Sequence, residues 1–226
     1  DVCSSDLRRI CRIFPLYFLI LGLFVCLTAM PIFSSPAFQW LFYGPLPIWS
    51  YASFTQNLLM SDRGDFGPHW LGITWSLAVE EQFYAFVSLL VYFLPRRKLI
   101  SVLVLAILAA PVLRWTFPGL TAFVNTLCRS DSLLSGAMLA VLVRCDRFVP
   151  TARRHQSFLF VFFLAFLLGA AVLTLRPDYF GVLNHLWLLG IYSILILICF
   201  ISSESFLGRM LGSSLLVWRS EEHTSE

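Results

Sequence analysis

The residues most able to do chemistry in this chain are two adjacent carboxylates, Glu80 and Glu81. They lie near the start of the stretch ITWSLAVEEQFYAFVSLLVYFL, which is apolar and long enough to cross a bilayer. An ionised acid in hydrocarbon costs several kcal/mol, so it normally pairs with a cation or has a functional role. A carboxylate here could assist a base or carry a proton. It could equally form an ion pair that holds helices together.

The two acids point to different sides of a helix, because successive helical residues are about 100° apart. Ser76 and Tyr84 share the side of Glu80, whereas Ser88 lies on the side of Glu81. We expect at least one acid to face the interior of a helix bundle. The sequence leaves open which of the two is functional.

Further ionisable residues are expected near the same membrane depth: Arg114, Arg129, Asp131 and His185. Either Glu80 pairs with Arg114 or Arg129 in a buried network that stabilises the bundle, or the cluster surrounds a reaction site. Arg129 and Asp131 are two residues apart and point to different sides of their helix, so they need not pair with each other. We place both at the acceptor side of a site or in a structural role.

The composition predicts an all-α protein, a polytopic transmembrane helix bundle in contact with the lipid bilayer. The chain is 58% hydrophobic and only 13% charged, whereas soluble domains are about 25% charged. Six stretches reach the length of about 20 residues that a span requires: 14–33, 73–94, 99–116, 126–144, 157–175 and 183–203.

The segment between the first two spans is aromatic and interrupted by prolines, which break helices. We expect it at the outer membrane interface, partly re-entrant. Its Gln56 and Asn57 could hydrogen-bond ligand hydroxyls at the outer face, or they could cap a short re-entrant helix.

Charge predicts the orientation of the spans, because basic loops stay on the cytoplasmic side. Arginine-rich loops precede the first span and follow the second, fourth and sixth. Arg9 and Arg12 lie one turn apart at the cytoplasmic mouth of the first span. They could bind the phosphate groups of a cytoplasmic substrate, since the guanidinium matches oxyanion geometry. Plain anchoring by the same charge rule is the alternative.

Several classes of partner are not expected. The six cysteines have no metal-ligand spacing, so we predict no metal site and no bound cofactor. The net charge of +3 is modest and forms no basic patch with interleaved aromatics, so nucleic acid is not an expected partner.

The two ends, DVCSSDL and RSEEHTSE, match neither the apolar body nor a targeting signal. Codons for residues 1–7 can be written whose reverse complement encodes residues 219–225, the pattern of a sequencing adapter translated at both ends. We therefore expect residues 1–7 and 219–226 to be adapter-derived, and residues 8–218 to be a partial transmembrane domain. Such segments carry no information about the fold.

Four stretches carry a resemblance to a known family. The stretch TWSLAVEEQFY (Thr74 to Tyr84) resembles the signature of the acyltransferase family 3 membrane proteins, bacterial O-acyltransferases of cell-surface glycans. In the family's order, RRICRIFPLY, FTQNLL and CRSDSLLSGAMLA are similar to its RxxR segment, its aromatic-Gln-Asn stretch and its Arg-x-Asp-x-Leu-x-x-Gly helix. The run LGRMLGSSLLVW also resembles the approach to the next family span.

The resemblance implies a multi-pass enzyme of the bacterial inner membrane with about ten spans of about 20 residues each. It would be an acyltransferase transferring groups other than aminoacyl groups. It would move an acyl group, acetyl being expected, from cytoplasmic acyl-CoA (acetyl-CoA) to a hydroxyl of a glycan or lipid-linked glycan. Arg9 and Arg12 would then handle acyl-CoA, and Glu80 and Glu81 would assist catalysis.

The same resemblance assigns Gln56, Asn57, Trp75, Ser76, Tyr84, Arg129 and Asp131 to the acceptor side or to structure. It places the family's essential histidine upstream of Arg8 and a Gly-x-x-Ser-Tyr pattern after Trp218, so this fragment alone is expected to be inactive. Two alternatives remain open: a polytopic transporter or permease that uses intramembrane acids as a proton relay, and a catalytically silent membrane scaffold.

Overall fold

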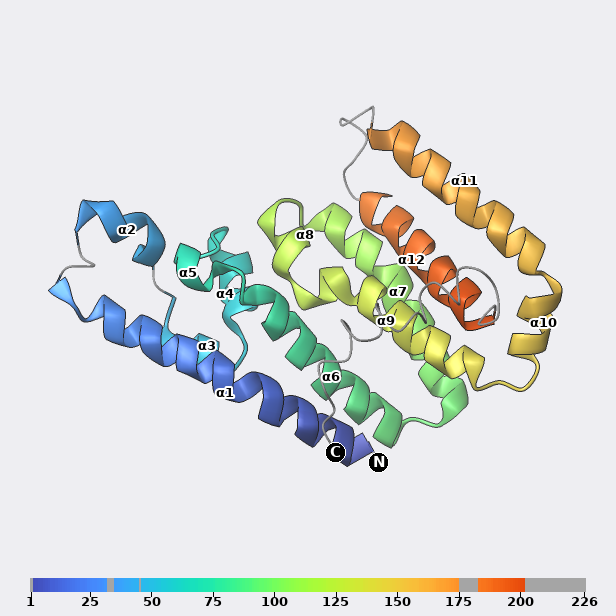
Figure 1. Cartoon of the computed structure of the whole chain (residues 1–226), viewed down its shortest axis with the longest axis horizontal. Coiled ribbons are helices and arrows are strands. Elements are labelled where there is room, and N and C mark those ends of the chain that lie inside the picture. Colours follow the sequence, from blue (N-terminus) through green and yellow to red (C-terminus); the bar gives the residue numbers. More distant parts are fainter. Residues whose placement is uncertain (1, 32–34, 45, 175–182, 202–226) are drawn as a thin grey trace, which may run out of the picture. The chain divides into compact units, whose positions relative to one another are not determined.

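The computed structural model describes residues 2–31, 35–44, 46–174 and 183–201, and every regular element among them is an α-helix (Figure 1). The chain divides into two compact units, and each is described on its own. Unit 1 comprises residues 1–93 and 116–129, and unit 2 comprises residues 94–115 and 130–226. The predicted all-α fold class is confirmed.

Unit 1 contains two longer helices and several short ones. Its helices are α1 (Val2–Thr28), α2 (Pro36–Phe42), α3 (Ile48–Ala52), α4 (Gln56–Arg63), α5 (His69–Gly72), α6 (Trp75–Phe93) and α8 (Leu120–Val124). The four short helices between α1 and α6 fill the segment that the sequence predicted to be broken by prolines. Pro47 and Pro68 directly precede α3 and α5, where proline is tolerated because the first backbone N–H groups of a helix have no partner within it.

Unit 2 is built from the longer apolar helices. They are α7 (Arg96–Thr116), α9 (Thr126–Val143), α11 (Gln156–Thr174) and α12 (Leu183–Ile201), with the short α10 (Phe148–Arg154) before α11. The first turn of α9 belongs to unit 1. These bounds lie within a few residues of the predicted spans.

Among the described residues, fewer stretches than the six predicted spans are both long and apolar enough to cross a membrane. In the described part of the chain, three stretches are long and apolar enough: Ile10–Thr28, Arg96–Thr116 and Leu120–Val143. A fourth counts if α10 and the following Gln156–Val172, which are bent by 73°, form one broken span. Helix α6 falls short because Glu80, Glu81 and Gln82 lower its hydropathy, and the apolar part of α12 that the structure describes, His185–Ile201, is shorter than the length that a span requires. The chain is a membrane-type helix bundle, but the six-span count is not confirmed.

The core of unit 1 joins α1 to the short helices. Buried side chains from α1, from the α2 to α5 segment and from α8 form one hydrophobic cluster: Leu21, Phe24, Phe42, Leu46, Tyr51, Met60, Leu71 and Val124. A second cluster packs Tyr17 of α1 and Phe54 against Ala78 of α6. The rings of Tyr17 and Phe54 stack with centroids 4.8 Å apart. These contacts fix α1 and α6 relative to the short helices between them.

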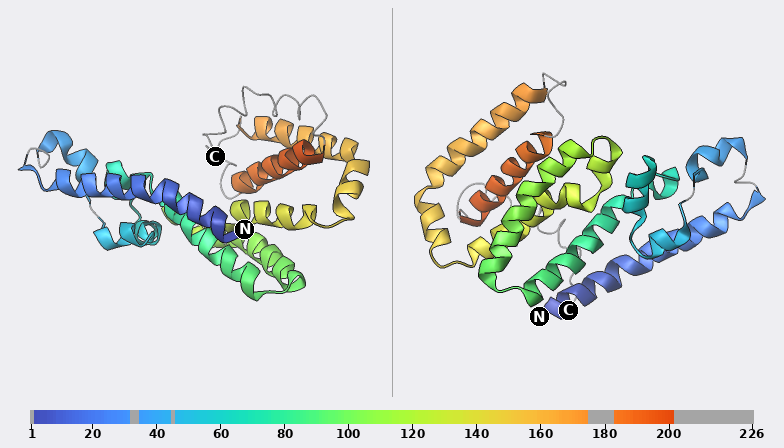
Figure 2. Two further views of the ribbon diagram at one scale, coloured as in Figure 1. Left: turned by 60° about the horizontal axis from the view of Figure 1, so that its bottom comes forward. Right: turned by 180° about the vertical axis from the view of Figure 1, so that it is seen from behind.

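In unit 2, α11 and α12 pack through two interlocking glycines, and both views in Figure 2 show these helices side by side. A Cβ atom on Gly169 of α11 would lie 2.2 Å from the Trp187 ring of α12, and one on Gly190 would lie 2.3 Å from Phe166. The Trp187 Nε1 also donates to the Phe166 carbonyl oxygen at 2.6 Å. Each helix therefore seats an aromatic ring where the other has no side chain, the close approach that small residues permit in membranes.

Gly169→Ala should therefore destabilise unit 2. We expect a loss of about 1–3 kcal/mol, the cost typical of overpacking, because the ring of Trp187 must move. Thermal unfolding of the detergent-solubilised chain measures the change. Gly136→Ala on α9 is the matched control, since a Cβ there meets nothing within 4 Å; equal melting temperatures for the two variants would contradict the interlocking.

Candidate functional site

Three side chains from three helices form a closed ring of hydrogen bonds in unit 1. Gln82 of α6 donates from Nε2 to Asn57 Oδ1 of α4 at 2.8 Å. Asn57 donates from Nδ2 to Thr126 Oγ1, at the first residue of α9, at 2.9 Å. The Thr126 hydroxyl closes the ring by donating to Gln82 Oε1. The ring therefore links α4, α6 and the start of α9.

Backbone carbonyls fix the direction of this ring. Gln82 Nε2 also donates to the Phe54 carbonyl oxygen at 2.7 Å, and Asn57 Nδ2 to the Val124 carbonyl oxygen at 3.2 Å. A carbonyl oxygen can only accept, so each amide must turn its NH2 group toward it. Thr126 then accepts from Asn57 and must donate to Gln82. Each amide has both of its N–H groups and its oxygen in use, which makes the arrangement rigid.

A second amide, Gln56 at the first residue of α4, joins α4 to α1 and to the residue before α6. Its Nε2 lies 3.0 Å from the Thr74 carbonyl oxygen and 3.4 Å from the Tyr17 hydroxyl. Tyr17 in turn donates to the Tyr51 carbonyl oxygen at 2.9 Å. The predicted roles of Gln56 and Asn57 were binding of ligand hydroxyls or helix capping. In the structure both side chains are fully buried, and their hydrogen bonds tie helices together, the geometry of a structural role.

Arg129 lies over two aromatic rings in unit 1. Its guanidinium carbon is 5.4 Å from the centroid of the Trp75 ring and 5.1 Å from that of Phe123. The two rings themselves pack with centroids 4.8 Å apart. Cation–π contacts of this kind are worth about 0.5–2 kcal/mol each. They bring the predicted residues Trp75 and Arg129 into contact and hold the charge of Arg129 at the start of α9.

The two acids differ in exposure. Glu80 is exposed, whereas Glu81 is half-buried, as expected for neighbours on different sides of α6. Tyr84 is 44% exposed, and the half-buried Ser76 donates its hydroxyl to the Ile73 carbonyl oxygen at 3.1 Å. The partial burial of Glu81 is consistent with the expectation that at least one acid turns toward the bundle.

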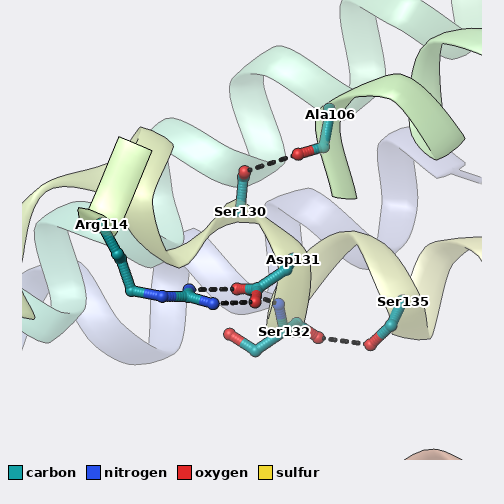
Figure 3. Close-up of polar contacts among 6 residues, drawn as sticks. All are labelled: Ala106, Arg114, Ser130, Asp131, Ser132 and Ser135. Carbon is teal, nitrogen blue, oxygen red and sulfur yellow. Dashed lines mark hydrogen bonds and ion pairs between the residues drawn. The ribbon is translucent and has the colours of Figure 1, made fainter. Parts of the chain in front are cut away.

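Asp131 and Arg114 form a buried ion pair within unit 2 (Figure 3). Arg114 Nη1 and Nη2 of α7 donate to the two carboxylate oxygens of Asp131 of α9 at 2.9 and 2.6 Å, and both side chains are only 1% exposed. The sequence predicted Arg114 as one of two possible partners for Glu80, beside Arg129. The structure gives Arg114 the carboxylate of Asp131, and this fork-to-fork pair fixes α7 against α9. For Asp131, the geometry is that of the structural role.

The remaining predicted residues are outside these clusters. Arg9 and Arg12 both lie on α1; only the side chain of Arg12 belongs to the described part, and it is exposed. His185 lies near the start of α12 and is half-buried. No group of three metal-ligating side chains occurs within the described ranges.

Tyr51 and Tyr17 should respond oppositely to loss of the hydroxyl. Tyr51 Oη is buried without a hydrogen-bond partner among the described residues, so Tyr51→Phe should be neutral or stabilising at pH 7. Tyr17→Phe removes a donor to the Tyr51 carbonyl oxygen and should cost about 1 kcal/mol. Chemical denaturation in detergent compares the two; a larger loss for Tyr51→Phe would contradict the geometry.

The buried hydroxyl of Tyr51 also predicts that the stability of the folded state depends on pH in the alkaline range. Burial raises the pKa of the Tyr51 hydroxyl well above its usual value, the neighbouring Tyr17 adds to the rise, and Arg63 opposes it. Because the folded-state pKa is raised, its contribution to stability is complete below pH of about 10 and is lost as the pH rises further. Denaturation curves at rising pH should show this loss in the wild type and a smaller one in Tyr51→Phe.

Sequence reasoning missed Gln82, Thr74 and Thr126 as site residues. Gln82 and Thr74 lie within the stretch TWSLAVEEQFY, beside residues that were singled out for their charge or aromatic ring. A polar amide in an apolar helix is itself a signal, because such a group must find partners there. Its partners, however, come from residues that are far apart in the chain.

Taken together, these elements define a membrane-type helix bundle whose polar residues meet in a buried network in unit 1 and a buried ion pair in unit 2. Comparisons with protein-family models, with curated proteins and with solved structures find no match to this chain.

Proposed function

We propose that this chain is part of a membrane-bound O-acyltransferase of the acyltransferase family 3 type. It would move an acyl group, acetyl being expected, from cytoplasmic acyl-CoA to a hydroxyl of an envelope or exported glycan. The host would be a bacterial inner membrane, with the arginine-rich loops in the cytoplasm. The donor and acceptor are substrates, and no bound cofactor is required.

One observation supports this proposal most. The four stretches that carry the resemblance are widely separated in sequence, yet all four contribute to one contact network in unit 1. Tyr17 contacts Gln56 and Gln56 contacts Thr74, Asn57 contacts Gln82, and Arg129 lies over Trp75. A signature whose members meet in space is what a shared site requires, whereas unrelated motif matches would scatter. The fifth stretch, residues 207–218, lies outside the described residues.

The chemistry assigns a role to the acids. In acyl transfer the acceptor hydroxyl attacks the thioester carbonyl, a base takes the hydroxyl proton, and the thiolate of CoA leaves and is protonated. Glu80 or Glu81 would orient or charge-balance that base. The base itself, by the family resemblance, would be a histidine upstream of Arg8.

Glu80→Gln or Glu81→Gln in the complete protein should abolish acyl transfer while leaving membrane insertion intact. A loss of at least about 100-fold is expected for the functional acid, the usual share of acid–base assistance. Radiolabel transferred from acetyl-CoA to glycan measures it, and gel filtration in detergent checks folding. Wild-type rates in both variants would rule out a role for the acids, and ion-coupled solute uptake into proteoliposomes would support a transporter instead.

A further inference from the structure

Five basic residues gather at one end of unit 2, where α7 begins and α9 ends. Arg96, the first residue of α7, donates from Nη2 to the Val141 carbonyl oxygen of α9 at 3.2 Å and to Cys145 Sγ at 2.9 Å. These contacts bring the turn PRRK beside the turn RCDR (Figure 1). All basic residues of the two turns are exposed, and the one acid of these turns is Asp146. We call the five basic residues the basic patch: Arg96, Arg97, Lys98, Arg144 and Arg147.

An exposed apolar face of α7 continues directly from the basic patch. Val104 and Leu108 lie within about 20° of Arg97 around the helix, and Leu105 lies within about 20° of Lys98. These three apolar side chains are 43%, 64% and 69% exposed, respectively. The buried apolar residues of α7 lie about 120–160° around the helix from Arg97: Leu99, Leu103 and Ala110. The basic patch therefore lies at the end of the face of α7 that turns away from the protein.

The length of this face matches one leaflet of a bilayer. Helix α7 is one of the helices that are long and apolar enough to cross a membrane. It rises about 16 Å from Arg97 to Leu108, at 1.5 Å per residue, and half of a hydrocarbon core is about 15 Å thick. When α7 crosses a bilayer, the basic patch lies at the level of the lipid headgroups. Val104, Leu105 and Leu108 then lie at the level of the acyl chains of the same leaflet.

We infer that the basic patch and the adjoining apolar face of α7 bind an anionic phospholipid. The headgroup phosphate accepts hydrogen bonds from guanidinium groups of the basic patch, because the planar fork of arginine matches oxyanion geometry. An acyl chain lies along Val104, Leu105 and Leu108. Basic residues beside a membrane-crossing helix attract anionic lipids, and each one strengthens binding about fivefold. The inference does not depend on acyl transfer, because it uses none of the residues assigned to that reaction.

Charge and hydrophobicity together favour this occupant over the others. A soluble anion such as CoA would meet the arginines but would leave the apolar face of α7 uncovered, and the same holds for a nucleic acid. A second copy of the chain would present the same positive charge in the same membrane orientation, because the same basic loops set it. A zwitterionic lipid covers the apolar face, but its headgroup has no net charge to match the basic patch.

A lipid titration of the full chain in neutral detergent tests the inference. The probe is phosphatidylglycerol with a fluorescent label on one acyl chain, and fluorescence anisotropy measures its binding. Binding should be at least about tenfold tighter than that of phosphatidylcholine with the same label. Arg97→Gln with Lys98→Gln should weaken phosphatidylglycerol binding at least about tenfold and leave phosphatidylcholine binding unchanged. Asp146→Asn, which removes the acid beside the basic patch, should strengthen phosphatidylglycerol binding.

Arg63→Gln is the matched control for the single variant Arg97→Gln, because it also removes one exposed arginine, from α4 in unit 1. The control should leave phosphatidylglycerol binding unchanged, whereas Arg97→Gln should weaken it about fivefold. Equal losses in these two variants, or equal affinities for the two lipids, would overturn the inference. Unlabelled phosphatidylglycerol should displace the probe, and displacement by CoA or glycerol 3-phosphate at the same concentration would overturn the inference as well.

The acyl-chain half of the site has a matched pair of its own. Leu105 of α7 and Leu168 of α11 are equally exposed, at 69% and 68%. Leu105→Ser should weaken phosphatidylglycerol binding at least about threefold, because it removes apolar contact with the chain, and Leu168→Ser should not. Gel filtration of each variant checks that the chains compared are folded. Equal binding by the two serine variants would show that the lipid does not lie along α7.

Discussion

Asp131→Ala should be the most damaging single substitution in the described part of the chain, with a loss of about 3–5 kcal/mol. The reason is that the guanidinium of Arg114 would stay buried at 1% exposure without the carboxylate that now accepts two of its hydrogen bonds. Breaking a buried pair costs far more than the pair contributes, because desolvation of the remaining charge is not compensated. Fluorescence-detected gel filtration after heating measures the change.

The double variant Arg114→Met with Asp131→Leu distinguishes the effect of leaving a buried charge unpaired from the effect of any substitution at residue 131. Replacing both charges with apolar side chains removes the desolvation cost, so this variant should recover most of the lost stability. Asp146→Ala, at an exposed site on the chain after α9, is the matched control and should change little. If Asp131→Ala melts at the same temperature as Asp146→Ala, the ion pair does not stabilise unit 2.

Gln82→Glu should have the second largest effect, although the two side chains have the same shape. The new oxygen would face the Phe54 carbonyl oxygen and Asn57 Oδ1, two acceptors that now receive N–H groups at 2.7 and 2.8 Å. At least one acceptor is left without a donor, and an ionised carboxylate would be repelled by both. We expect a loss of about 2–4 kcal/mol, measured by chemical denaturation in detergent.

Thr126 provides the matched pair for this test. Thr126→Val keeps the shape of the side chain but removes the donor to Gln82 Oε1, and should cost about 1–3 kcal/mol. Thr126→Ser keeps the hydroxyl and should cost much less. Similar stability of the valine and serine variants would show that the closed ring does not stabilise unit 1.

The helices could be predicted from sequence because they follow the apolar runs, which are local features. The predicted segments 99–116 and 126–144 became α7 and α9 with shifts of a few residues. Helix α6 is not among the stretches that are apolar enough to cross a membrane, and the reason is local as well: three consecutive polar side chains, Glu80 to Gln82, lie within its apolar run.

The partners of the polar side chains could not be predicted, because they depend on packing between distant segments. Asp131 and Arg114 were both singled out for their charge, yet spacing gave no indication that they pair with each other. Asn57 and Gln82 lie 25 residues apart, and nothing in either stretch specifies the register of α4 against α6. The direction of the ring depends on the backbone carbonyls of Phe54 and Val124, which sequence patterns do not locate.

The most direct test of the account is transfer of label in sealed, inverted membrane vesicles that contain the complete protein. Radiolabelled acetyl-CoA is added outside, at the cytoplasmic face, and a glycan acceptor is enclosed in the lumen. The account predicts that label accumulates on the glycan as an ester, and that Glu80→Gln with Glu81→Gln prevents this without loss of folded protein. Folded wild-type protein that transfers no label to any enclosed glycan would contradict it.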